Sequence, residues 1–168
     1  MTQASIPTIS YKIQNQPFGC LIYDIPVSES RVYEKVKRII RKTALPMNLS
    51  VYLVPWALRD QIEELLKEHM THRCDIKFIK FDDSSIEELS VQVERSLLKL
   101  VAGIYRRIDE KVQEVKKKTA TQQYDFKYDI EKRIEDVETL IAIFGLTQDV
   151  QDAVKAVKML YKAEVEVL

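Results

Sequence analysis

Glycine is scarce in this sequence, with three in 168 residues. A phosphate-binding loop built from backbone amides needs several closely spaced glycines, so a site of that kind is not expected. The sequence also contains no Walker motif, GxSxG, HExxH or CxxC, which removes the common signatures of nucleotide, hydrolase and zinc sites. We therefore expect no cofactor.

Cysteines and long apolar runs are scarce as well. Cys20 and Cys74 both fall in predicted strands, and two buried thiols are favoured over a disulfide because residues 1–16 lack the basic and apolar regions of a signal peptide. No apolar run approaches the roughly 18 residues that a membrane span needs. We expect a cytoplasmic protein with no membrane contact.

The chain also lacks an excess of either charge. Lys plus Arg and Asp plus Glu each number 26, so binding to nucleic acid or acidic lipid would have to come from a local patch. With 46% hydrophobic and 31% charged residues, the composition is that of a helix-rich globular protein and not of a disordered one.

The pattern of residues 17–82 predicts a small module in the order β-α-β-α-β. Phe18–Ile25 is an apolar run interrupted only by Asp24, as in a buried central strand, whereas residues 74–81 alternate and predict one wet face. The other predicted elements are a helix from an N-cap at Ser28 to Thr43, a strand over Leu49–Val54 and a helix over Ala57–Met70.

Residues 84–168 predict a long antiparallel helical hairpin and a final helix. Ser84 and Ser85 open capping boxes, and Gly145 with Thr147 supplies a C-cap followed by an N-cap. Apolar side chains recur at steps of three and four to about Lys118, and again along the second arm, in a heptad pattern that favours self-association. The seam residues expected to form a homo-oligomer are Val93, Leu97, Leu100, Ile104, Ile134 and Ile141.

Together these patterns predict an α+β fold. A ferredoxin-like or related module would follow a flexible arm over residues 1–16 and precede the hairpin.

The first predicted helix is strongly basic. Between Ser28 and Thr43 it carries six bases and two acids, and its bases recur on the side opposite the Val and Ile stripe. Such a surface suits contacts with nucleic-acid phosphates. The alternative is a solvated face paired with Glu63, Glu64 and Glu68 of the next helix, which is slightly favoured because charge runs usually only face water. The candidate nucleic-acid-binding residues are Arg31, Lys35, Arg38, Arg41 and Lys42.

Two further groups could carry metal chemistry. Asp24 ends an apolar strand, where a carboxylate either caps the turn at Pro26 or binds a metal. His69, His72 and Cys74 are close in sequence, but their irregular spacing differs from that of zinc sites, and a structural role is favoured.

The remaining aromatic and basic groups have simpler interpretations. Trp56 with Tyr52 could form an aromatic platform, although a place in or beside the core is commoner. Arg106 with Arg107 and the Lys116–Lys118 run are most simply a polar outer helix face.

Residues 21–55, with LIYDIPVSESRVYEKVKRII followed by LSVYLVP, carry a family resemblance. They resemble the amino-terminal domain of chromate-resistance regulatory proteins, and also ferredoxin-like CRISPR adaptation nucleases and the similar domain of phenylacetate-type repressors. The resemblance, taken over residues 18–81, implies a metal-proximal role for Asp24 and a shared helix arginine at Arg31. The long hairpin departs from the nucleases, as does a helix directly after LSVYLVP where a third strand is expected.

Three hypotheses follow. The first is a non-enzymatic, oligomeric, regulatory or nucleic-acid-associated protein that presents the basic helix. The second is a scaffold whose hairpin binds a helical protein partner. The third, ranked last because Asp24 has no clear second ligand, is a metal-dependent phosphodiesterase.

Overall fold

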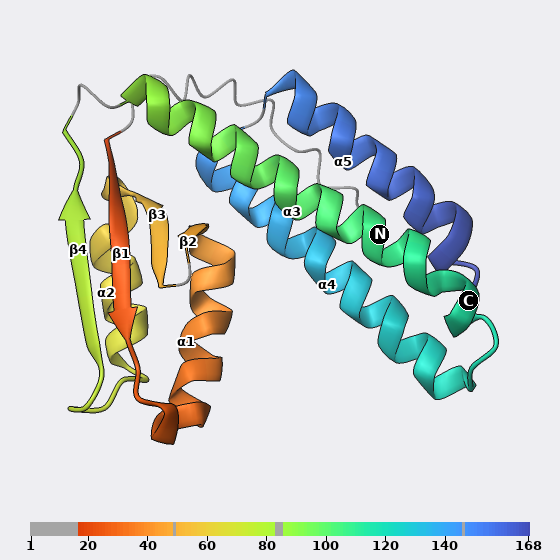
Figure 1. The fold of residues 1–168 in the computed structure, drawn as a ribbon, viewed down its shortest axis with the longest axis horizontal. Coiled ribbons are helices and arrows are strands. Elements are labelled where there is room, and N and C mark those ends of the chain that lie inside the picture. Colours follow the sequence, from red (N-terminus) through yellow and green to blue (C-terminus); the bar gives the residue numbers. More distant parts are fainter. Residues whose placement is uncertain (1–16, 49, 83–85, 146) are drawn as a thin grey trace.

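The computed structural model describes residues 17–48, 50–82, 86–145 and 147–168. The fold is α+β, as the sequence predicts: a four-stranded antiparallel sheet with two helices precedes three long helices (Figure 1). The predicted arm over residues 1–16 and the predicted capping serines at 84 and 85 lie outside the described residues.

The sheet is built around the first strand. β1 (Phe18–Asp24) lies between β3 (Val51–Pro55) and β4 (Asp75–Lys80) and pairs antiparallel with both. β2 (Leu45–Asn48) pairs with β3 at one edge, which gives the order β2-β3-β1-β4. The apolar run of β1 therefore does form a central strand, as predicted.

β2 is a strand that the sequence interpretation missed, so the predicted order β-α-β-α-β was wrong and the order is β-α-β-β-α-β. The sequence prediction ends the first helix at Thr43 and begins the next strand at Leu49, with no strand around Pro46. Proline has no N–H to donate to a ladder, but it is tolerated at a sheet edge, which is where β2 lies. The pairing of β2 with β3 is irregular between Pro46 and Asn48.

Two helices cover one face of the sheet. α1 (Ser30–Thr43) follows a short 3-10 turn over Val27–Glu29, and α2 (Arg59–Lys67) follows another over Trp56–Leu58, so α2 is shorter than predicted. The core between these helices and the sheet consists of Leu21, Tyr23, Val36, Ile40, Ala44, Val54, Ile62 and Leu66.

The last three helices pack side by side. α3 (Ile86–Val115) contacts both α4 (Ala120–Phe144) and α5 (Gln148–Leu160), and α5 ends in a π turn over Tyr161–Val165 (Figure 1). The predicted turn between α4 and α5 is confirmed, because Gly145 ends α4 with a φ of 96° and the Thr147 hydroxyl accepts from the Val150 amide. α3 ends three residues before Lys118, and a capping box of Thr119 and Gln122 starts α4.

The sheet and the helices share one core. Phe18 of β1 stacks on Phe144 of α4, with ring centroids 6.1 Å apart, and Leu45 and Leu53 join the same cluster of buried side chains as α3, α4 and α5. The apolar stripe of the hairpin is therefore occupied within the chain. None of the described helices has the length and apolar character required to cross a membrane.

Candidate basic helix and adjoining cleft

The bases of α1 are mostly exposed and largely without acidic partners. Arg31, Lys35, Arg38 and Arg41 are exposed and Lys42 is half-buried. Only Arg41 forms an ion pair with a described residue, and Arg31, Lys35, Arg38 and Lys42 form none. The alternative in which α2 neutralises this helix is not realised among the described residues, because Glu63 instead pairs with Arg59 and Lys67 of its own helix, each at 2.6 Å.

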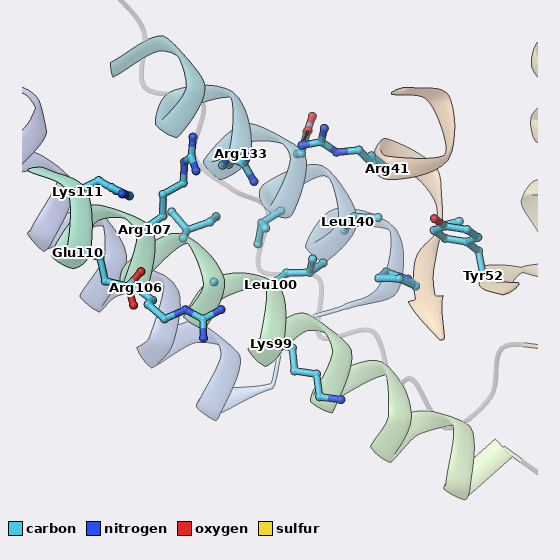
Figure 2. A pocket seen from close by; sticks show the side chains of 16 residues that line it. Arg41, Tyr52, Lys99, Leu100, Arg106, Arg107, Glu110, Lys111, Arg133 and Leu140 are labelled. Atoms are coloured by element: carbon cyan, nitrogen blue, oxygen red, sulfur yellow. Dashed lines mark ion pairs between the residues drawn. The ribbon is translucent and has the colours of Figure 1, made fainter. Parts of the chain in front are cut away.

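A concave cleft opens beside the C-terminal end of α1, where this helix packs against α4. Its volume is about 480 Å³, within the range of small-molecule sites. Figure 2 shows Leu100 and Leu140 between α3 and α4, Tyr52 at one end, and basic side chains around them. The lining residues are Arg41, Ala44, Pro46, Tyr52, Lys99, Leu100, Gly103, Ile104, Arg106, Arg107, Glu110, Lys111, Arg133, Asp136, Val137 and Leu140.

The lining is polarised in charge. It contains six basic side chains and two acidic ones, a formal charge of +4 in a chain whose net charge is zero. Asp129 and Glu114, which lie outside the lining, pair with three of these bases, and an excess of positive charge remains. Such an excess in a cleft favours anions. Its floor is apolar, so an anion with an apolar body is the ligand that matches it.

Several of these bases are held by carboxylates. Arg107 of α3 and Arg133 of α4 both pair with Asp129, at 2.8 and 3.0 Å. Partial burial alone would raise the pKa of Asp129, but the hydrogen bonds and charges of the two arginines outweigh it and hold the pKa below its usual range. This carboxylate thus stays ionised and fixes both guanidinium groups at one end of the cleft.

Arg41 connects the cleft to α1. Its guanidinium lies 3.7 Å from the buried carboxylate of Asp136 on α4, and its own side chain remains 47% exposed. At that distance the pair is too long for a strong hydrogen bond, so donor capacity remains on the guanidinium. Arg41 therefore belongs both to the basic face of α1 and to the cleft.

Lys99 and Arg106 are the two bases of the lining that form no ion pair or side-chain hydrogen bond with a described residue. Both project from α3 on the same side of the cleft (Figure 2). Gly103 lies between them on this face, and a Cβ added there would meet nothing within 4 Å. Packing therefore does not require glycine at this position. In the interior of a helix, here one of 30 residues, glycine lowers stability by about 1 kcal/mol relative to alanine.

Asp24 lies away from this cleft and is exposed at the end of β1. It faces Asp75 of β4 in the strand register, and Asp75 pairs with Lys77 at 3.3 Å. The described residues contain no group of three or more His, Cys, Asp or Glu side chains that could hold a metal ion. That statement covers His69, His72 and Cys74 as well as Asp24.

The two cysteines are both free, as the sequence predicts for a reduced pair. Cys20 is buried in β1, where burial raises the pKa of its thiol and so lowers its reactivity. Cys74 is only half-buried, and its sulfur lies 3.5 Å from the Thr71 hydroxyl.

The seam residues proposed for self-association lie inside the monomer. Four are buried and two are partly buried in the core that α3, α4 and α5 share with the sheet. Leu100 and Ile104 also line the cleft. The full set in this core is Val93, Leu97, Leu100, Ile104, Ile134 and Ile141.

The sequence interpretation did not find the cleft. Arg106 and Arg107 were assigned to a polar outer face, and Arg41 only to the basic helix. The signal that was present is the spacing of Lys99, Gly103 and Arg106, which places a glycine between two bases on one helix face. The opposite wall comes from α1 and α4, whose approach no local pattern predicts.

The comparisons with known proteins add no relative. No protein-family model, curated protein or solved structure matches the chain. The resemblance of residues 18–81 to regulatory and nuclease domains therefore stays a prediction.

Proposed function

We propose that this chain is a non-enzymatic, nucleic-acid-associated regulatory protein that binds the phosphate backbone through α1 and the adjoining cleft. The observation that carries the proposal is the exposed row of bases on α1, of which only Arg41 has an acidic partner among the described residues. Basic side chains that are not neutralised by neighbouring acids are free to exchange their counterions for phosphates.

The arrangement of the module supports the resemblance drawn from its sequence. Its element order β-α-β-β-α-β is that of a ferredoxin-like domain, and we propose this fold for it. The sequence analysis counted a helix directly after LSVYLVP as a departure from the resembled families. With β2 included, LSVYLVP corresponds to the third strand of the module, and a helix is expected after it. Nuclease activity is not proposed, since Asp24 is exposed and belongs to no metal-binding group among the described residues.

The scaffold hypothesis receives less support. That hypothesis has the hairpin bind a helical partner, and the seam residues of α3 and α4 are packed within the chain, so a partner would have to bind other faces of these helices. Self-association stays a prediction, and any such contact would have to use a surface other than the seam.

The test is fluorescence anisotropy with labelled single- and double-stranded DNA and RNA over a range of salt. We expect affinity to fall steeply with salt, and Arg31→Ala/Arg38→Ala to weaken binding. If each arginine neutralises one phosphate, the double variant lowers the slope of log K against log salt by about 1.4 on single strands and 1.8 on duplexes.

A charge-matched control is available on the other side of the bundle. Lys155 and Lys162 are exposed on α5 and the π turn that follows it. Lys155→Ala/Lys162→Ala removes the same net charge, so it should change binding much less than the α1 variant. Equal loss in both variants, or binding that neither changes, would contradict the proposal.

A further inference from the structure

We propose that the cleft binds one nucleoside phosphate, with the phosphate at Lys99 and Arg106 and the planar base on the apolar floor. The inference extends the proposed function, because it names the unit of nucleic acid that this cleft accepts. The source of the nucleotide is either a free mononucleotide or a nucleotide of a single strand held by α1.

The position of the phosphate follows from the ion pairs. Arg107 and Arg133 are already paired with Asp129, and Lys111 with Glu114 at 3.5 Å. Arg41 keeps donor capacity, but the Asp136 carboxylate lies beside it at 3.7 Å. Lys99 and Arg106 are the lining bases left without an acidic partner among the described residues. A phosphate on the face of α3 between them therefore displaces no ion pair of the described residues.

The base position follows from the shape and chemistry of the floor. Leu100, which is half-buried, contributes most of the accessible apolar lining, and Ile104, Val137 and Leu140 lie beneath it at 2–5% exposure. Tyr52 closes one end with an aromatic ring (Figure 2). Tyr52 is held in place by stacking on Tyr23, with centroids 5.8 Å apart. Aromatic faces are sequence-tolerant platforms for bases, and a fixed ring loses little entropy on binding.

Gly103 keeps the space between phosphate and base open. A Cβ at this position would meet no atom within 4 Å, so glycine leaves open space on the helix face between Lys99 and Arg106. A glycine that packing does not require, in the interior of a long helix, is accounted for if a ligand occupies that space. Because a base within a duplex is stacked and paired, only a free or single-stranded nucleotide can enter.

The experiment is isothermal titration calorimetry of the full chain with adenosine 5′-monophosphate, adenosine and inorganic phosphate. We expect one binding site for the monophosphate and at least about tenfold weaker binding of the other two, because each lacks half of the recognised groups. Competition with a labelled single-stranded oligonucleotide then shows whether a strand uses the same site.

Gly103→Leu is the decisive variant, since leucine favours the helix and fills the cleft. It should weaken monophosphate binding at least tenfold, and Arg106→Gln should do the same by removing a charged donor. The matched control is Ala102→Leu, which places the same side chain at an exposed position of α3 that does not line the cleft. Circular dichroism of all three variants verifies that they fold.

The outcomes separate this inference from the proposed function. Monophosphate binding that is absent, or equal in Gly103→Leu and Ala102→Leu, overturns the cleft assignment, even if strands still bind through α1. A second outcome is that the chain binds the monophosphate but no strands, and that Gly103→Leu abolishes this binding whereas Ala102→Leu does not. This outcome supports the cleft as a site for free nucleotides and overturns the proposed function.

Discussion

The three glycines of this chain differ in what their missing side chain does. Gly145 supplies the positive φ that ends α4, whereas Gly19 permits a close approach. A Cβ at Gly19 would lie 2.6 Å from Trp56 Cε3 and 2.7 Å from the Ile79 carbonyl oxygen. Gly103 has neither the positive φ of Gly145 nor the close neighbours of Gly19. Its lack of a side chain is therefore explained by the cleft that it lines and not by packing.

Substitution by alanine should therefore have opposite effects at two of these positions. We expect Gly103→Ala to raise the free energy of unfolding by about 1 kcal/mol, because alanine favours the helix and its Cβ meets nothing. Gly19→Ala should lower it by about 1–3 kcal/mol, because the Ile79 backbone cannot yield without distorting the sheet. Urea unfolding measures both, and a destabilised Gly103→Ala would contradict this account of the cleft.

The Asp129 carboxylate gives the cleft an acid dependence. Its pKa is lower in the folded chain than in the unfolded one, so its contribution to stability is present above about pH 4 and is lost as pH falls through the folded pKa. We expect the stability of the unmodified chain to fall more steeply below about pH 4 than that of Asp129→Asn. Because Asp129 is 36% exposed, the difference should not exceed about 1 kcal/mol.

Urea titrations of both proteins between pH 2.5 and 7 test this expectation. Parallel curves would show that the ion pairs of Asp129 with Arg107 and Arg133 contribute no measurable stability that depends on pH.

At the scale of elements, α5 depends on its first turn. The Thr147 hydroxyl accepts from the Val150 amide at 3.4 Å and donates to Glu94 of α3 at 2.9 Å, so one side chain both caps α5 and ties it to α3. Helices of this length are marginal alone, and their start sites matter.

Thr147→Ala should therefore lower the free energy of unfolding by about 1–2 kcal/mol, the effect of losing an N-cap together with a side-chain hydrogen bond. Thr139→Ala is the matched control, because Thr139 is exposed on α4 and its hydroxyl donates to the Glu135 carbonyl of the same helix, with no bond to another described element. Chemical denaturation should show a clear loss for the first variant and little change for the second, and similar losses would refute the role of the cap.

At the scale of the whole molecule, the shared core determines how the chain unfolds. Phe18 and Phe144 stack across the junction between the sheet and the helices, and Leu45 and Leu53 extend the same cluster. The single tryptophan, Trp56, reports on the sheet, whereas far-ultraviolet circular dichroism reports mainly on the helices.

We expect urea transitions followed by Trp56 fluorescence and by circular dichroism to coincide. The reason is that the sheet module and the three long helices bury the apolar surface around Phe18 and Phe144 only against each other. Phe144→Ala should cost about 3–5 kcal/mol and shift both transitions together. Two separate transitions in the unmodified chain would show that the sheet module and the helical part unfold independently.

The elements with strong local signals were predictable. The apolar run of Phe18–Ile25 identified the central strand, the α1 stripe identified a helix, and Gly145 with Thr147 located the turn before α5. β2 was not predictable in the same way, because a four-residue edge strand containing Pro46 carries no period and its pairing with β3 is a tertiary contact.

The sequence by itself determined the α+β class, the position of the long helices and the basic character of α1. These follow from local periodicity and capping, which nearby residues specify. Only the tertiary structure decided that the hairpin seam faces inward and that Arg41, Lys99, Arg106 and Arg133 line one cleft. The reason is physical: α1 is separated along the chain from α3 and α4 by three strands and a helix, and the approach of these elements is set by burial of the shared core.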